Sequence, residues 1–145
     1  MMAEVRIARV TDVEDLEGRL RAADLVELKA HGVRGREALS AGLSSSKPCY
    51  SIEHEGRCIG LFGATHTEDQ PSVGHVWLLG ADEIGDISTQ FLRESREWLG
   101  QISKPYRLVC NVVHEDNELH MRWLKFLGFK FLRREAPFIE FARIV

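Results

Sequence analysis

The segment Val113–Phe129 reads VHEDNELHMRWLKFLGF. It starts at the end of an apolar, β-like run, Tyr106–Val113, and passes through a polar turn, His114–Asn117. The next residues, Glu118–Leu127, carry apolar side chains at the four-residue spacing of one helix face, at Leu119, Trp123 and Leu127. Gly128 then ends the helix, because glycine readily adopts the left-handed conformation common at helix C-termini. The segment predicts a strand, a turn and a helix in succession.

The flanking sequence supplies the remaining elements. Thr11-Asp12-Val13-Glu14 has the form of a capping box, which predicts a helix from there to about residue 31. Gly56 predicts a tight hairpin. The other predicted elements are a strand over 5–10, a helix over 35–43, strands over 49–54, 57–65 and 73–79, a helix over 87–102, and strands over 129–133 and 138–144. The order β-α-α-β-β-β-α-β-α-β-β predicts one α/β (α+β) domain over residues 1–145, with helices covering a mixed sheet.

Composition narrows the class of protein. The chain has 145 residues, of which 44% are hydrophobic and 28% charged, an ordinary globular balance. Its 19 basic and 22 acidic residues give a net charge of −3, so nucleic-acid binding through a basic surplus is not expected. Three cysteines without a Cys-x-x-Cys pair argue against a disulfide framework or a zinc site. The N-terminal stretch 1–9 alternates charged with apolar residues, and we expect a cytoplasmic protein without signal peptide or membrane span.

The element order and the segment Val113–Phe129 together resemble the GNAT superfamily of acetyl-CoA-dependent N-acyltransferases. In that family a strand-ending Val lies four residues before an Asn, here Val113 and Asn117. Gly and Phe follow 11 and 12 residues after the Asn, here Gly128 and Phe129. The resemblance implies a GNAT-like mixed sheet and transfer of an acetyl group from acetyl-CoA to an amine.

A narrower resemblance involves three segments. Trp77–Asp82, Phe91–Leu99 and Arg122–Phe129 resemble small phage GNAT-like proteins that are often labelled internal virion protein A of T7-like phages. This likeness implies a phage-infected bacterial cell, and association with the virion, as the setting of the protein.

The resemblance assigns acetyl-CoA to one set of residues, Leu78, Leu79, Gly80, Gly85, Ser88 and Asn117. The family binds the cofactor pyrophosphate on a glycine-rich loop at a helix start, where backbone amides favour anions. The corresponding stretch here is Gly80–Thr89, with a single interior glycine and no Arg or Gln. It carries Asp82, Glu83 and Asp86, which either cap the helix or oppose the pyrophosphate.

Candidate catalytic residues cluster after the fifth strand. The family's usual Tyr acid corresponds to Leu124, which has no proton to give. His120 on the same helix is a candidate acid or base, or else a structural histidine. His114 and Glu115, with Asp116, are candidate bases, or else form only the polar turn. Asn117 either holds the pantetheine arm or only caps the helix.

Two functions stay open from the sequence. One is an active N-acetyltransferase acting on an unidentified amine. The other is a catalytically inactive GNAT-fold phage protein that acts as a binding or virion-associated module for a protein partner. Among other side chains, His54, His66 and His75 lack the spacing of metal ligands, so no metal site is expected.

Overall fold

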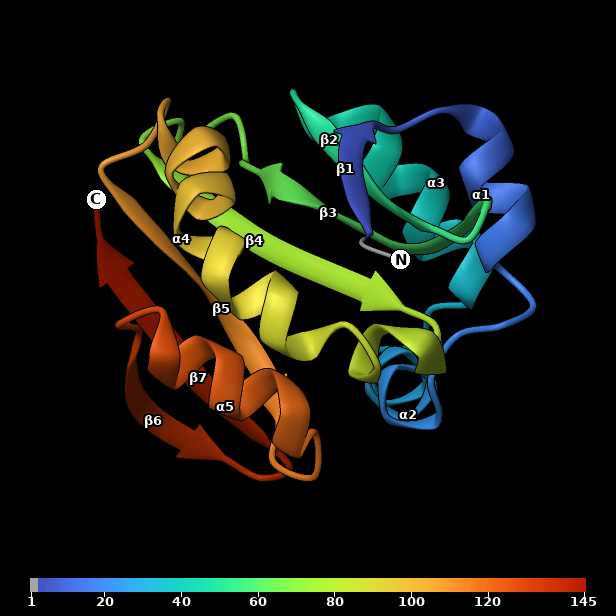
Figure 1. The fold of residues 1–145 in the computed structure, drawn as a ribbon. Helices are drawn as coiled ribbons and strands as arrows, with labels where there is room; N and C mark the ends of the chain where they lie inside the picture. The colour runs from blue at the N-terminus through green and yellow to red at the C-terminus, as the bar shows by residue number, and fades with distance from the viewer. Residues whose placement is uncertain (1–2) are drawn as a thin grey trace.

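The computed structural model describes residues 3–145; Met1 and Met2, the first residues of the stretch used for the signal-peptide expectation, lie outside the described part. Figure 1 shows a twisted sheet flanked by helices. The chain forms, in order, β1 (Glu4–Ile7), α1 (Val10–Leu16), α2 (Ala22–Ala30), α3 (Gly35–Ser45), β2 (Cys49–His54), β3 (Arg57–Thr65), β4 (Val73–Gly80), the 3₁₀ helix η1 (Asp82–Gly85), α4 (Ser88–Ser103), β5 (Leu108–His114), α5 (Glu118–Phe126), β6 (Lys130–Glu135) and β7 (Phe138–Ile144).

One sheet of seven strands runs in the order β1-β2-β3-β4-β5-β7-β6. All neighbours are antiparallel except β4 and β5, which are parallel and joined through α4. Glu55 and Gly56 both have positive φ angles, 52° and 76°, as the predicted tight β2–β3 hairpin requires. Gly128, with φ of 87°, ends α5 as predicted. The predicted mixed α/β architecture is confirmed.

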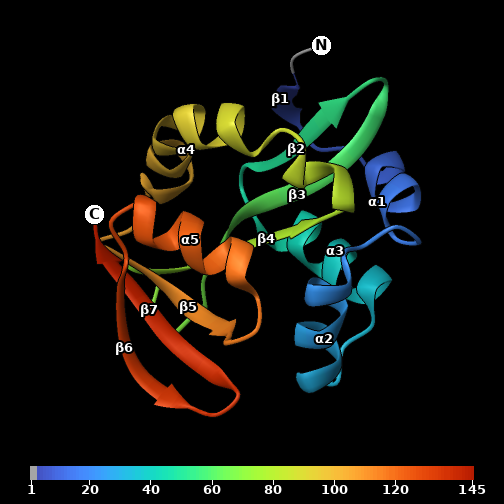
Figure 2. The same cartoon turned by 60° about the horizontal axis from the view of Figure 1, so that its bottom comes forward.

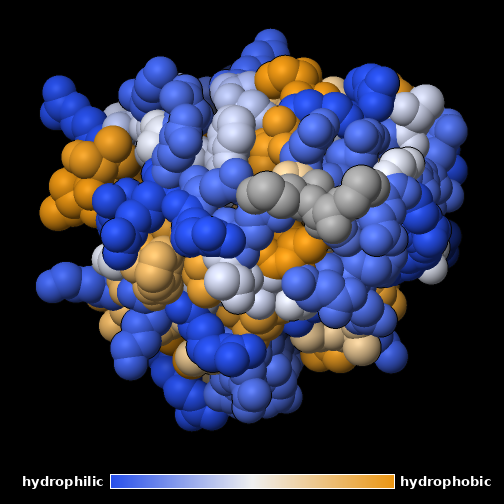
Figure 3. Space-filling view, viewed as in Figure 1, coloured by the Kyte–Doolittle hydropathy of each residue, from blue (hydrophilic) through white to orange (hydrophobic). Residues whose placement is uncertain are grey.

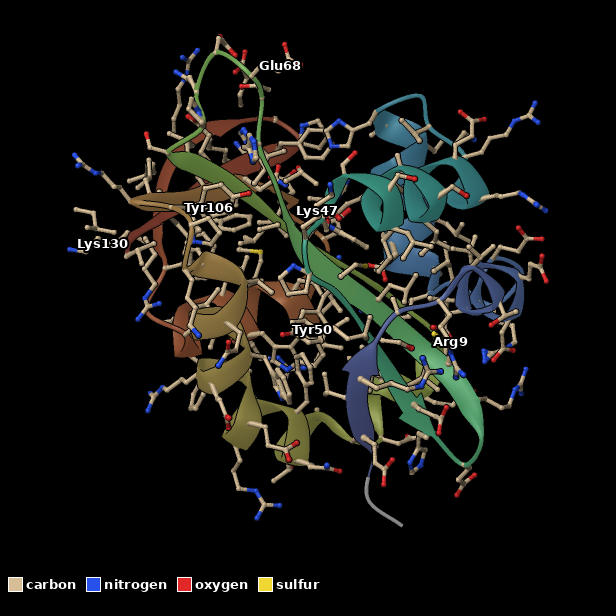
Figure 4. All side chains as sticks on the ribbon, turned by 90° about the horizontal axis from the view of Figure 1, so that it is seen from above. Arg9, Lys47, Tyr50, Glu68, Tyr106 and Lys130 are labelled. Atoms are coloured by element: carbon tan, nitrogen blue, oxygen red, sulfur yellow. The ribbon has the colours of Figure 1, made fainter. Side chains whose placement is uncertain are left out.

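Helices cover the two faces of the sheet (Figures 1 and 2). On one face α3 approaches β4 so closely that a Cβ atom on Gly42 would lie 2.5 Å from the Trp77 ring. On the other face Phe62 of β3 packs edge-on against Phe91 of α4, at 6.1 Å between ring centroids. Tyr50 of β2, labelled in Figure 4, packs at 5.1 Å from Trp98 on the same helix.

The helix expected from residue 11 to residue 31 is wrong as a single element, because the chain forms α1 and α2 there. The break is caused by contacts to distant residues. Leu20 forms an isolated β-bridge with Ala81, and the Arg21 amide donates to the Gly80 carbonyl at 2.8 Å. Residues held in extended pairing cannot continue a helix, so tertiary contacts end α1 early.

The predicted capping box also shifts. Helix α1 starts at Val10 rather than at the predicted Thr11, with Arg9 as its N-cap. Asp12, not Glu14, reaches back and accepts a 2.7 Å bond from the Arg9 amide. Arg6 forms an ion pair with the same carboxylate, with Nη2 2.8 Å from Oδ1. Asp12 is 4% exposed, so this pairing fixes α1 against β1.

The surface seen in Figure 3 is mainly hydrophilic, with apolar atoms gathered near the C-terminus. Ile144 is 82% exposed and Val145 54%. Within residues 3–145, every helix is too short or too polar to cross a bilayer.

Candidate active site

The two parallel strands at the middle of the sheet separate part of the way along. Pairing between β4 and β5 covers only Val73–His75 on one strand and Leu108–Cys110 on the other. Beyond this point β4 runs on to Gly80 and β5 to His114 without pairing to each other. The sheet therefore contains a wedge-shaped gap that opens toward the C-terminal ends of both strands.

Asn111 occupies the point where the strands separate. Its Nδ2 donates to the Val76 carbonyl at 2.9 Å, and its Oδ1 accepts from the Val112 amide at 2.8 Å. The side chain thus satisfies two backbone groups that a continuous ladder would otherwise pair.

A cavity of about 540 Å³ passes through this gap. Glu27, His31 and Gly42 line it on the side of α2 and α3, and Phe91, Leu99 and Trp123 on the side of α4 and α5. Leu78, Leu79 and Asn111 lie between the two sides. Two molecules that entered from opposite faces of the sheet would meet between the strands, a geometry suited to group transfer.

A buried polar network closes the wide end of the gap. Asp24 of α2 is 0% exposed, and its Oδ2 accepts from the Gly80 amide at 3.0 Å. Its Oδ1 accepts from Asn117 Nδ2 and from Arg21 Nη1, each at 3.2 Å. Arg21 Nη2 also donates to Asn117 Oδ1 at 3.3 Å. The network therefore ties α2 to the end of β4 and to the start of α5.

His120 of α5 lies inside this network, between Arg21 and Asn117. Arg21 Nη1 lies 3.2 Å from Nε2, and Asn117 Nδ2 lies 3.2 Å from Nδ1. Burial lowers the pKa of His120 from 6.5 to about 4; the Asp24 carboxylate opposes that shift and Arg21 adds to it. The imidazole is therefore neutral at pH 7 and lines the cavity without a proton to give away readily.

Glu27 faces the cavity one helical turn after Asp24. Burial raises the pKa of its carboxyl above the ordinary 4.5; the bond to the His114 amide opposes this, and the Asp24 charge adds to it. That bond joins Glu27 Oε1 to the backbone nitrogen of His114 and anchors the carboxyl at the end of β5. A carboxyl with a raised pKa at the edge of a cavity is suited to accept a proton.

The donor set does not fit a metal ion. Ligand atoms of Asp24, Glu27 and His120 lie within 4.8 Å of one another. However, the Arg21 guanidinium already lies 3.2 Å from both Asp24 Oδ1 and His120 Nε2. A second cation would be repelled there.

The structure distributes the predicted catalytic residues unevenly. Only His120 lines the cavity. His114 is 7% exposed, and its side chain accepts from the Asp116 amide at 3.1 Å and packs edge-on against Phe138. Glu115 pairs with Arg134 of β6, with 2.6 Å between Oε2 and Nη2. These two side chains lie outside the cavity lining, although the His114 backbone holds Glu27.

Of the residues predicted to bind the cofactor, some line the cavity and others lie elsewhere. Leu78 and Leu79 line the cavity, whereas the Asn117 side chain is used within the buried network. Gly80 lies where β4 ends, Gly85 is exposed in η1, and Ser88 starts α4. Leu124, at the place of the family's acid, lines the cavity with an apolar side chain.

The sequence interpretation missed Arg21, Asp24 and Glu27. Their spacing of three residues places them on one side of a helix, which is a usable signal. The opposite side carries Leu25 and Val26, which are 47% and 49% exposed. Helix α2 therefore exposes two apolar side chains, while its inward side carries the polar residues together with Leu28, which packs against the core.

No protein-family model and no curated protein sequence matches the chain. Solved structures do. An N-acetyltransferase from Staphylococcus aureus superposes with a TM-score of 0.69 at 12% identity, covering 99% of both chains. PaiA N-acetyltransferase from Thermoplasma acidophilum, crystallised with coenzyme A, gives 0.67 at 13% identity over 100% of both. A GNAT-family acetyltransferase from Bacillus anthracis gives 0.67 at 10% identity, covering 99% of this chain and 95% of that one. The fold of this chain is the GNAT fold.

Proposed function

We propose that the chain is a GNAT-type N-acyltransferase that moves an acetyl group from a thioester, as in acetyl-CoA, to an amine. The observation that carries the proposal is the cavity that passes through the sheet between β4 and β5. It has a carboxyl group, Glu27, on the side of α2 and an apolar wall on the side of α4 and α5. The amine enters from the first side and the thioester from the second.

The donor would be aligned along the open edge of β4. The Val76 carbonyl and the Gly80 amide both point into the gap, where Asn111 and Asp24 bind them. Because backbone groups of alternate residues share an edge, the N–H and C=O of Leu78 also point there. They offer one donor and one acceptor to the amides of a pantetheine arm.

In the proposed reaction the amine nitrogen attacks the thioester carbonyl carbon, a C–N bond forms, and the C–S bond breaks. Glu27 accepts the proton that the amine loses. His120 stays neutral and helps position the network that holds α2 against α5. Leu124 supplies no acid, so the departing thiolate takes its proton from water.

The test uses acetyl-CoA and acetyl-pantetheine with a panel of primary amines, and measures free thiol. We expect amine-dependent thiol release that falls at least about tenfold in Glu27→Gln. Glu14→Gln, an exposed glutamate on α1, is the matched control and should keep full activity. Absence of amine-dependent release with both thioesters would contradict the proposal.

A second proposal is favoured by the apolar Leu124 and by the acidic turn after β4. In it the chain is a non-catalytic GNAT-fold module of a phage, acting in the cytoplasm of the infected cell or within the virion. Mass spectrometry of purified phage particles tests the location. Detection of the chain together with absent thiol release would support this second function, and absence from particles would contradict a virion role.

A further inference from the structure

The turn after β4 is built differently from a phosphate-binding loop. At its start the Gly80 amide donates to Asp24 at 3.0 Å and the Ala81 amide donates to the Ile59 carbonyl at 2.9 Å. A diphosphate cradle needs free amides that converge on the anion. These two amides are already bound to protein groups.

Hydrogen bonds within the turn occupy two further backbone amides. In η1 the Ile84 amide donates to the Ala81 carbonyl at 3.1 Å, and the Asp86 amide to the Glu83 carbonyl at 3.0 Å. Ile84 is 0% exposed, and a Cβ on Gly80 would lie 2.9 Å from its Cδ1. The buried isoleucine therefore fastens the turn onto the sheet.

The negative charge of the turn also disfavours a bound diphosphate. Asp82 and Asp86 are exposed on this turn and Glu83 is half-buried. The stretch from residue 80 to residue 90 contains no Lys or Arg. A diphosphate placed at the start of α4 would face carboxylates at close range and without a local counter-charge.

The cavity on the side of α4 and α5 is, by contrast, apolar. Phe91, Leu99, Trp123 and Phe129 line it, each buried. Such walls suit the methylene and methyl groups of a pantetheine arm. The apolar cavity thus suits the acyl-pantetheine arm of a coenzyme A thioester, whereas the acidic turn disfavours its nucleotide diphosphate.

We infer that the chain recognises its donor through the acyl-pantetheine arm alone, and that the nucleotide diphosphate of coenzyme A adds no affinity. This inference rests on the proposed acyl transfer and names the donor class within it: thioesters of pantetheine, whatever is attached beyond the arm. The bound amides and the carboxylates of the turn of residues 80–86 do not fit a diphosphate, and no step of the reaction runs through that group.

Calorimetric titration compares acetyl-pantetheine with acetyl-CoA on the full chain. We expect dissociation constants within about threefold of each other, because the shared arm carries the binding. Acetyl-CoA binding about tenfold or more tighter than acetyl-pantetheine would overturn this inference while leaving the proposed function intact. Failure of both compounds to bind would contradict the proposed function itself.

A charge-neutralised variant sharpens the comparison. Asp82→Asn with Asp86→Asn should tighten acetyl-CoA binding several-fold at low salt, about 10 mM, and leave acetyl-pantetheine unchanged. The matched control is Glu68→Gln with Asp69→Asn, in the β3–β4 loop at the opposite end of β4 (Figures 1 and 4). It should change neither affinity. An equal effect of both double variants would overturn the local role of the acidic turn.

Discussion

The Nδ2 of Asn111 donates a 2.9 Å hydrogen bond to the carbonyl oxygen of Val76 where β4 and β5 separate. The bond lets the strands diverge without leaving the first backbone groups beyond the ladder unpaired. Asn111 also lines the cavity, so one side chain both maintains the gap and forms part of its wall.

Asn111→Leu should therefore destabilise the fold. It removes two hydrogen bonds and leaves the Val76 carbonyl and the Val112 amide without side-chain partners, which costs about 1–3 kcal/mol. Urea unfolding measures the loss. Asn111→Asp keeps an acceptor for the Val112 amide but turns a carboxylate oxygen toward the Val76 carbonyl, so its free energy of unfolding should also fall below that of the unaltered chain. Equal stability of Asn111→Leu and the unaltered chain would refute this role.

The ion pair between Arg21 and Asp24 should show strong coupling. Asp24→Asn leaves the Arg21 guanidinium, whose side chain is 12% exposed, without its carboxylate, at a cost of about 3–5 kcal/mol. Arg21→Met with Asp24→Asn should cost less than the sum of the single changes. A double-mutant cycle in urea measures the difference, and additive effects would exclude the coupling.

Glu27→Gln should raise stability at neutral pH. The folded state raises the pKa of Glu27, so it binds this proton more tightly than the unfolded chain does. The stability that this proton provides is present below the ordinary value of 4.5 and is lost as pH rises through the folded value. Glutamine keeps an oxygen for the His114 amide and cannot ionise. The variant should therefore gain stability at pH 7 and match the unaltered chain at pH 4.

Unfolding measured from pH 4 to pH 7 tests the sign of the stability change that Glu27→Gln causes. Glu14→Gln, at an exposed position of α1, serves as the control for removing one carboxylate. A Glu27→Gln variant that is less stable than the unaltered chain at pH 7 would show that the ionised carboxylate stabilises the fold.

His120 should remain neutral across the physiological range. Its pKa is lowered to about 4, so the folded chain resists a proton that the unfolded chain takes up near 6.5. Stability from this residue is present above 6.5 and falls as pH drops toward 4. A proton NMR titration of the imidazole should show no transition between pH 5.5 and about 7.5. A His120 midpoint near 6.5 would contradict the buried network.

Much of the fold could be predicted because its signals are local. The four-residue spacing before Gly128 predicted α5, and the left-handed glycine confirms its end. The break at Leu20 could not be predicted in this way, because its cause is a bridge to Ala81, 61 residues away. Local helix propensity alone predicted one continuous helix from residue 11 to about residue 31.

The candidate site was less accessible to sequence reasoning. His120 could be singled out because it lies near Asn117, but its neighbours Arg21 and Asp24 come from the N-cap and first turn of α2, 99 and 96 residues earlier. Whether a side chain faces the cavity depends on how β4 and β5 diverge. Glu115 is a plausible base by residue type, yet the position of β6 pairs it with Arg134.

Helix α2 presents Leu25 and Val26 to the outside while its charged side is buried. Besides its polar contacts, α2 packs Leu28 against the core and along the cavity. Exchange of Leu25 or Val26 should therefore leave the core unchanged, whereas Leu28 is constrained together with Asp24 and Glu27. The outward side of α2 can thus vary in sequence while the sheet stays the same.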